Sequence, residues 1–325
     1  MLPAGRTALR ASRLAIPPLR SNGCRWLSTS SKLYTSHSLP KYRAAIQSRT
    51  PDPKTIDAPR RFREFELDGR VFIVTGAAGG LGLALAEALV EAGGYVYCLD
   101  RAIEPPATFF ETQDQLAHHY KGSLQYRRVD VSDAKALDSL IGGIAAEHNR
   151  MDGLVAAAGI QYICKALEYP PDKITEMMNI NYKGVYLSAV SCARQMIKYD
   201  TAGSIVLIGS MSGLIANKQL FSSVYNSSKA AVIQLGRSLA MEWKEIVHGR
   251  PIRVNVLCPG NTMTPMVRKN IEDEPHLKQL WERENMLGRL AEPHEFRGAT
   301  LFMLSDASSF MTGAHLVIDG GYTAW

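Results

Sequence analysis

The sequence predicts a single doubly wound α/β domain, in which helices cover both faces of a central parallel sheet. Short apolar runs at residues 71–74, 95–99 and 204–208 alternate with longer stretches of helical character. Unbroken apolar runs are typical of strands that are buried on both faces. The 325 residues are 46% hydrophobic and 21% charged, which suits a globular protein with a sizeable core. We therefore expect one domain, not a cofactor domain joined to a separate substrate domain.

The beginning of the chain carries the excess of basic charge. Residues 1–51 hold nine Lys or Arg and no acid, so the other 28 basic residues face all 31 acidic ones. An opening that is rich in arginine and serine and free of acids is typical of a mitochondrial transit peptide. We predict a disordered, cleaved transit peptide to the matrix at residues 1–39, a linker at 40–66 and the folded domain at 67–325. A disordered tail without a targeting role is the alternative.

Composition also disfavours several classes of function. Because the basic charge lies in the leader, a nucleic-acid partner is not expected. No 18-residue run is both apolar and uncharged, so we expect no membrane span. The histidines lack the spacing of metal ligands, and no metal is expected. The five cysteines contain no C-x-x-C pair, which favours reduced, mostly buried thiols over disulfides.

A glycine-rich turn follows the first apolar run. It is TGAAGGLG at residues 75–82 and leads into a helical stretch. In such a turn Gly76 permits the tight bend, Gly80 lets the backbone approach a pyrophosphate, and Gly82 lets the helix pack closely on the strand. The helix N-terminus offers unpaired N–H groups to the anion. Strand, turn and helix together predict a Rossmann-type dinucleotide site.

The second apolar run ends at Asp100-Arg101, about 20 residues after the glycine turn. A carboxylate at this position can accept hydrogen bonds from the adenosine ribose hydroxyls and repel a 2′-phosphate. Asp100 therefore favours NAD over NADP. Arg101 could accommodate the phosphate, so NADP stays open as the alternative. An ordinary ion pair at a strand end is the non-functional interpretation of the two residues.

Tyr225 and Lys229 form a Y-x-x-x-K pattern after the run at 204–208. On a helix, positions i and i+4 lie on one face. An ammonium beside a phenol lowers the phenol pKa, which a tyrosine that transfers protons near neutral pH requires. The same pattern is also common on surface helices, so it gains weight here only from the glycine turn upstream.

With both motifs in place, the chain resembles the short-chain dehydrogenase/reductase family over about residues 66–325. The further segments that match in order are Asp130 after a strand at 125–129, Asn181 in MNINYKG, Pro259-Gly260 with Thr264, and Asp319-Gly320-Gly321. One segment departs from the family: residues 156–159 are AAAG instead of the usual NNAG. Ala158 and Gly159 preserve the close approach to the cofactor, but the two missing amides leave the rigidity of this turn in doubt.

The resemblance implies a catalytic tetrad. Tyr225 is the expected general acid/base, and Lys229 lowers its pKa and holds the nicotinamide ribose. Ser210 is expected to hydrogen-bond the substrate oxygen, and Asn181 to order a water that connects Lys229 with solvent. The cofactor contacts that the resemblance implies are Gly76, Gly80, Leu81, Gly82, Asp100, Asp130, Val131, Ala158, Gly159, Tyr225, Lys229, Pro259, Gly260 and Thr264.

Ser212 is the alternative to Ser210, because it stands 13 positions before Tyr225, the commoner spacing in the family. Ser210 is preferred because SMSGLIAN at residues 210–217 resembles fungal-type polyol dehydrogenases, which have a longer loop after this segment. These include the D-arabinitol, mannitol and sorbose types. The Tyr225-Asn226 pair and the ending GGYTAW resemble the same subgroup.

Two long helices are expected at residues 172–198 and 222–246, and in this family they form the interface of a homotetramer. A charged helix at 268–284 is expected either to cover the substrate, with Leu277, Leu280 and Trp281 facing inward, or to be a plain surface helix.

The function expected from this resemblance is NAD-dependent interconversion of a sugar alcohol, similar to D-arabinitol, and its ketose. The first alternative is a mitochondrial 3-oxoacyl-[acyl-carrier-protein] reductase, and the second is a non-catalytic NAD-binding scaffold. Asp100 and the mildly acidic domain favour the polyol enzyme over the reductase. An intact tetrad argues against the scaffold.

Overall fold

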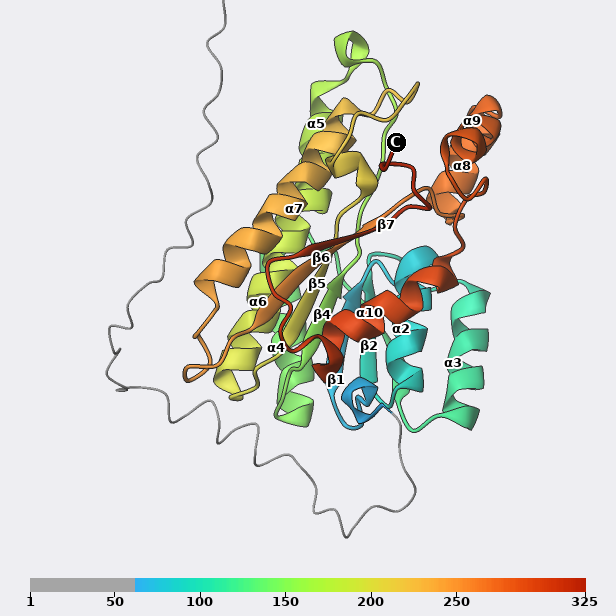
Figure 1. Ribbon diagram of the computed structural model, residues 1–325. Helices are drawn as coiled ribbons and strands as arrows, with labels where there is room; N and C mark the ends of the chain where they lie inside the picture. The colour runs from blue at the N-terminus through green and yellow to red at the C-terminus, as the bar shows by residue number, and fades with distance from the viewer. Residues whose placement is uncertain (1–61) are drawn as a thin grey trace, which may run out of the picture. The chain divides into compact units, whose positions relative to one another are not determined.

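Seven parallel strands form the central sheet of the computed structural model, which describes residues 62–325 (Figure 1). Their order across the sheet is β3-β2-β1-β4-β5-β6-β7. The strands are β1 (Val71–Thr75), β2 (Tyr95–Asp100), β3 (Ser123–Arg128), β4 (Gly153–Ala156), β5 (Ser204–Ile208), β6 (Arg253–Pro259) and β7 (His315–Ile318). The predicted transit peptide (1–39) and most of the predicted linker (40–66) lie outside the described residues.

Helices connect successive strands. The α-helices are α2 (Gly80–Glu91), α3 (Ala107–His119), α4 (Ala134–His148), α5 (Pro171–Met178), α6 (Val185–Lys198), α7 (Ser223–Glu242), α8 (Pro265–Asp273), α9 (His276–Glu284) and α10 (Arg297–Leu304). Short helices are η2 (Arg63–Phe65), η3 (Ala166–Glu168), the π-helical η4 (Asn179–Gly184), η5 (Met211–Gly213), η6 (Pro293–Phe296) and η7 (Asp306–Ser308).

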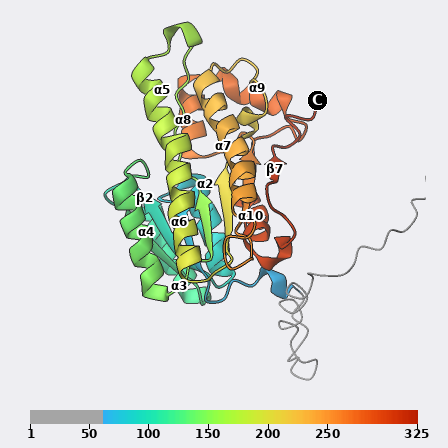
Figure 2. The same ribbon diagram turned by 90° about the vertical axis from the view of Figure 1, so that its left-hand side faces the viewer.

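The strands bury both faces, as the unbroken apolar runs predict. In β1, Val71 and Ile73 pack into the core beneath α4, α6 and α7, whereas Phe72 and Val74 pack into the core beneath α2, α3 and α10. Figures 1 and 2 show these two helical layers on opposite sides of the sheet. The predicted doubly wound α/β class is therefore confirmed. The strand order reverses between β1 and β4, and ligands of such sheets bind beyond the carboxyl ends of the strands at that point.

The structure corrects three of the predicted helices. The helix predicted at 172–198 contains a π-helical turn at Asn179–Gly184, where five-residue bonding adds one residue to the turn. The one predicted at 268–284 is two helices, because Pro275 lacks the N–H that would continue α8. The one predicted to reach 246 ends at Glu242, and Trp243 caps it. Each correction lies near the carboxyl end of the sheet or at the end of a helix.

Candidate active site

A cavity of about 150 Å³ lies where the strand order reverses. Six of the predicted cofactor residues line it, together with Arg101, the candidate for a 2′-phosphate, and four residues that the motifs did not identify. The lining residues are Gly76, Leu99, Asp100, Arg101, Val129, Asp130, Val131, Ala158, Gly159, Ile160 and Ile180. Ile160 directly follows Gly159, and Ile180 directly precedes Asn181. Their positions next to motif residues could have identified them from the sequence.

The glycine turn packs as tightly as its spacing predicts. Gly76 adopts φ +67°, and a Cβ built there would lie 2.6 Å from the Cα of Ala158. A Cβ on Gly82 would overlap the carbonyl oxygen of Gly76. Gly79, in contrast, has no neighbour within 4 Å of its Cβ position. The turn therefore leaves open space above the first turn of α2, where helix N–H groups could receive a pyrophosphate.

Two aspartates border the adenosine end of this cavity. Asp100 accepts hydrogen bonds from the backbone N–H groups of Ala78 (3.2 Å) and Ala102 (3.3 Å), which fix its carboxylate against the glycine turn. Asp130 accepts from the N–H and hydroxyl of Ser132 at 2.8 and 2.7 Å. These hydrogen bonds hold the pKa of Asp130 below its usual value. Both carboxylates are thus oriented acceptors that fit an adenosine.

The AAAG segment is tied down despite its missing amides. The backbone N–H of Ala158 donates to the Thr75 hydroxyl at 3.2 Å, which links β4 to the start of the glycine turn. A Cβ on Gly159 would lie 3.4 Å from Asn181 Oδ1 and 3.5 Å from Lys229 Nζ. The glycine therefore lies directly beside two of the predicted catalytic residues.

Ser210, Tyr225 and Lys229 come together at the carboxyl end of β5. The Ser210 side chain lies close enough to the Tyr225 hydroxyl to lower the pKa of its phenol, and Ser210 Oγ accepts a hydrogen bond from the backbone N–H of Ser212 at 3.1 Å. Lys229 Nζ lies 5.8 Å from the centroid of the Tyr225 ring and donates to the Ile208 carbonyl at 2.9 Å. Of the two candidate serines, Ser210 is the one whose side chain contacts the tyrosine.

Asn181 lies in the π-helical turn η4 and is fully buried. Its side chain hydrogen-bonds both backbone polar groups of Ile160: Oδ1 accepts from the N–H (2.8 Å), and Nδ2 donates to the carbonyl (2.9 Å). Nδ2 also donates to the Ser228 hydroxyl at 3.1 Å. Asn181 thus joins the loop after β4 to the helix of Tyr225 and Lys229. The water that was predicted between Asn181 and Lys229 stays a prediction.

Burial opposes charge on both members of the Tyr225–Lys229 pair. It raises the pKa of the Tyr225 phenol, and the neighbouring Ser210 side chain offsets only part of this rise. Burial lowers the pKa of Lys229 to about 8, with a small opposing contribution from Cys258. Burial therefore favours the neutral form of both side chains of the pair.

The loop after β6 and the helices α8 and α9 cover this end of the sheet. Thr264 caps α8, its hydroxyl accepting from the Val267 N–H at 3.4 Å, and a Cβ on Gly80 would lie 3.2 Å from Pro265. Leu277, Leu280 and Trp281 of α9 are buried in a third apolar cluster, as predicted. Thr264 and Pro265 thus lie against the glycine turn, whereas Gly260 packs against Asp319.

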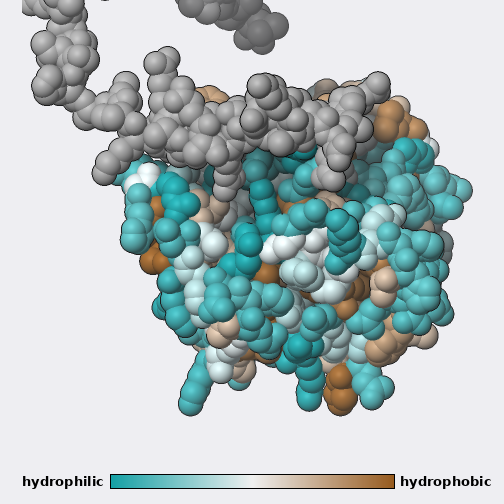
Figure 3. Space-filling view, turned by 90° about the horizontal axis from the view of Figure 1, so that it is seen from below, coloured by the Kyte–Doolittle hydropathy of each residue, from teal (hydrophilic) through white to brown (hydrophobic). Residues whose placement is uncertain are grey.

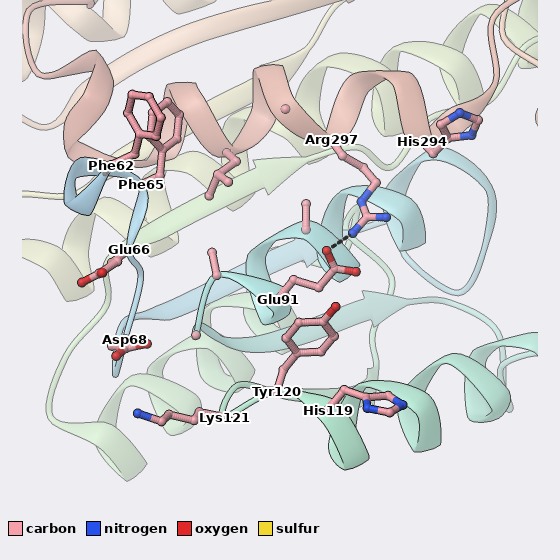
Figure 4. A pocket seen from close by; sticks show the side chains of 15 residues that line it. Phe62, Phe65, Glu66, Asp68, Glu91, His119, Tyr120, Lys121, His294 and Arg297 are labelled. Carbon is pink, nitrogen blue, oxygen red and sulfur yellow. Dashed lines mark ion pairs between the residues drawn. The ribbon is translucent and has the colours of Figure 1, made fainter. Parts of the chain in front are cut away.

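A larger depression of about 800 Å³ lies at the other end of the sheet (Figure 4). It is bordered by the C-terminal ends of α2 and α3, and Glu91 and Arg297 form an ion pair across it. The visible surface at that lower end is mostly hydrophilic (Figure 3). None of the predicted catalytic or cofactor residues lines this depression. We therefore place the active site at the smaller cavity, where the titratable residues and the strand ends meet.

Three further properties of residues 62–325 bear on the class of protein. In this range no three or more His, Cys, Asp or Glu side chains come close enough to hold a metal ion. None of the helices in the same range has the length and apolar character to cross a membrane. The described cysteines, Cys98, Cys164, Cys192 and Cys258, are free thiols.

The fold and the site define a nicotinamide-dependent oxidoreductase. The chain belongs to the short-chain dehydrogenase/reductase family: residues 76–323 match the family model described as enoyl-(acyl carrier protein) reductase. It is 41% identical over 287 residues to the short chain dehydrogenases/reductase notP′ of Aspergillus versicolor, covering 88% of this chain and 96% of that one. It is 37% identical over 271 residues to the ribulose-forming D-arabinitol 2-dehydrogenase of Scheffersomyces stipitis, covering 80% and 96%.

A similar solved structure is the gluconate 5-dehydrogenase of Burkholderia cenocepacia in complex with NADP and tartrate. The TM-score is 0.73 at 29% sequence identity, with 81% of this chain and 99% of that chain covered. The cofactor class NAD(P) follows from the family.

Proposed function

We propose that this protein is an NAD-dependent dehydrogenase that interconverts a sugar alcohol, similar to D-arabinitol, and its ketose. The observation that carries the proposal is the Ser210–Tyr225–Lys229 arrangement beside a dinucleotide cavity. The similarity to D-arabinitol 2-dehydrogenase supports the substrate class. The oriented Asp100 carboxylate supports NAD, because it would repel a 2′-phosphate.

The residues of the site divide the chemistry of the reaction. When bound, the oxidised nicotinamide supplies the hydride acceptor and a positive charge. Tyr225 takes the proton of the alcohol during oxidation and returns it during reduction. Ser210 hydrogen-bonds the substrate oxygen and stabilises charge that develops on it. Lys229 holds a neighbouring positive charge when protonated, which favours the phenolate of Tyr225.

Asn181 and the glycine turn position the cofactor and the catalytic side chains. Asn181 fixes the loop after β4 against the helix of Lys229 through one buried side chain. Gly76, Gly80 and Gly82 would hold the pyrophosphate at the start of α2. Asp100 and Asp130 would orient the adenosine.

The assembly and location are also part of the proposal. Apolar side chains on the outer faces of α5, α6 and α7 are exposed, including Ile174 (40%), Tyr186 (41%) and Met241 (65%), and they suit a homotetramer interface. Light scattering that gives a monomer mass would contradict it. The acid-free leader supports the mitochondrial matrix, and a protein recovered from another compartment with its leader intact would argue against it.

The proposed function is tested by assaying residues 62–325 and the full chain on pentitols and hexitols, with NAD and NADP compared side by side. We expect NADH formation from an arabinitol and a kcat/KM for NAD about tenfold or more above that for NADP. Reduction of a 3-oxoacyl thioester with NADPH, without polyol oxidation, would favour the acyl-carrier-protein reductase instead. Cofactor binding without turnover of either substrate would favour the scaffold.

The pH dependence of oxidation tests the role of Ser210. Because Tyr225 must be deprotonated to accept the alcohol proton, kcat/KM for oxidation should rise with pH until the pKa of Tyr225 is passed. Ser210→Ala removes the side chain that lowers this pKa, so the increase of kcat/KM should occur at higher pH. The maximal kcat/KM should also be lower than that of the wild type. Ser212→Ala is the matched control and should leave the position of the rise unchanged. Equal pH profiles for all three proteins would remove Ser210 from the proposed role.

A further inference from the structure

A pair of amide side chains joins two distant segments beside the tetrad. Gln161, in the loop after β4, accepts a hydrogen bond through Oε1 from Nδ2 of Asn270 on α8, at 2.7 Å. The two residues are 109 positions apart, and both are partly exposed. The pair therefore links the loop beside the cofactor cavity with the helices that cover this end of the sheet.

The backbone places Gln161 next to the reacting groups. Its neighbour Ile160 lines the cofactor cavity, and Asn181 binds both the N–H and the carbonyl of Ile160. The position of a Cβ on Gly159 is 3.5 Å from Lys229 Nζ. Gln161 thus directly follows a segment that the tetrad itself holds in place, so its side chain starts from a fixed point.

The side of the cover that packs inward is apolar. Asn270 shares its helix with Val267 and Ile271, which pack against a cluster that includes Met211 and Trp281. A sugar alcohol carries a hydroxyl on every carbon. Moving a hydroxyl out of water costs free energy unless the protein gives it a hydrogen-bond partner. An apolar cover alone would therefore favour a plain alcohol over a polyol. The amide pair supplies hydrogen-bonding groups at the edge of this cover.

We propose that Gln161 recognises a hydroxyl group of the substrate next to the reacting carbon, and that Asn270 is its positioning residue. This inference rests on the proposed function and names a specificity-determining residue for it. Asn270 occupies one lone pair of Gln161 Oε1 and so fixes the amide plane, and no acceptor within residues 62–325 takes the two N–H groups of Nε2, which are the donors offered to substrate. A fixed donor loses less freedom on binding than a rotating one.

The test compares a polyol with an alcohol that lacks the neighbouring hydroxyls. Gln161→Leu, Asn270→Leu and the double variant are assayed on the preferred pentitol and on 2-pentanol, and a hydroxyketone is compared with its parent ketone in the reverse direction. Lys269→Leu is the control on α8, because that side chain is 72% exposed and forms its ion pair with Asp273 of the same helix. Thermal melting of each variant reports on the fold.

We expect Gln161→Leu to lower kcat/KM for the pentitol about 10- to 100-fold, mainly through KM, and to leave 2-pentanol unchanged or improved. Asn270→Leu should lower kcat/KM for the pentitol by a smaller factor. The double variant should lower kcat/KM no further than Gln161→Leu does, since both residues act through one contact. Lys269→Leu should match the wild type.

Two results would overturn the inference. Equal losses on the pentitol and on 2-pentanol would show that the pair only supports the loop, and no loss on either would show that the substrate does not contact it. If the wild type oxidises no polyol, the proposed function fails. In that case the role of Gln161 is tested by kcat/KM for reduction of the hydroxyketone divided by kcat/KM for reduction of the parent ketone. If Gln161→Leu leaves this ratio unchanged, the inference about Gln161 is overturned, and if the ratio falls, the inference is supported.

Discussion

Tyr225→Phe is expected to reduce turnover between about 10²- and 10⁴-fold, the usual contribution of a positioned acid/base group. The substitution removes only the hydroxyl, which is the atom that the Ser210 hydroxyl contacts, and keeps the ring beside Lys229. The packing of α7 should therefore stay intact. The measurement is kcat for alcohol oxidation under saturating cofactor.

Two controls separate lost chemistry from lost structure. Tyr120→Phe alters a partly exposed tyrosine after α3, at the other end of the sheet from the Ser210–Tyr225–Lys229 group, and should keep wild-type kcat. Fluorescence titration with NADH should give Tyr225→Phe a dissociation constant close to that of the wild type, because the predicted phosphate and adenosine contacts are unchanged. Full turnover by Tyr225→Phe would refute the proposed mechanism. A large loss of NADH binding would assign the defect to the cofactor site instead.

Sequence predicted the parts of the site that are set by local spacing. The glycine turn depends on residues within one strand–turn–helix unit, so TGAAGGLG defined both its bend and its close packing. Tyr225 and Lys229 share one helical face because they are four residues apart. The side chains of Asp100 and Asp130 reach the same cavity because parallel strands end at the same edge of the sheet.

Contacts between distant segments could not be predicted in this way. Spacing alone would have favoured Ser212, and the preference for Ser210 came only from the resemblance of SMSGLIAN, because the approach of the loop after β5 to α7 depends on the backbone of η5. The π-helical turn at Asn181 depends on packing as well, since a Cβ on Gly184 would lie 2.6 Å from Val131. The Gln161–Asn270 hydrogen bond spans 109 residues and carries no motif. Pro275 was visible in the sequence, however, and its effect on the predicted helix at 268–284 was missed.

Gly76→Ala is expected to lower the free energy of unfolding by about 3 kcal/mol or more. Two costs add: an alanine would adopt the left-handed φ of +67°, and its Cβ would lie 2.6 Å from Cα and 2.7 Å from N of Ala158. Both neighbours are backbone atoms, so relief requires β4 to move away from β1. That movement would also displace Gly159, which lies beside Asn181 and Lys229. Chemical denaturation, with NADH binding measured in parallel, checks the prediction.

Gly79→Ala is the matched control from the same turn. Its backbone is extended, with φ −176°, and its Cβ position has no neighbour within 4 Å, so stability should fall by less than about 1 kcal/mol. The open space at Gly79 is also where the pyrophosphate would lie, so the methyl group should weaken NADH binding more than it weakens the fold. Equal destabilisation by the two substitutions would mean that the approach of Ala158 does not constrain the turn. Unchanged NADH binding in Gly79→Ala would place the phosphates elsewhere.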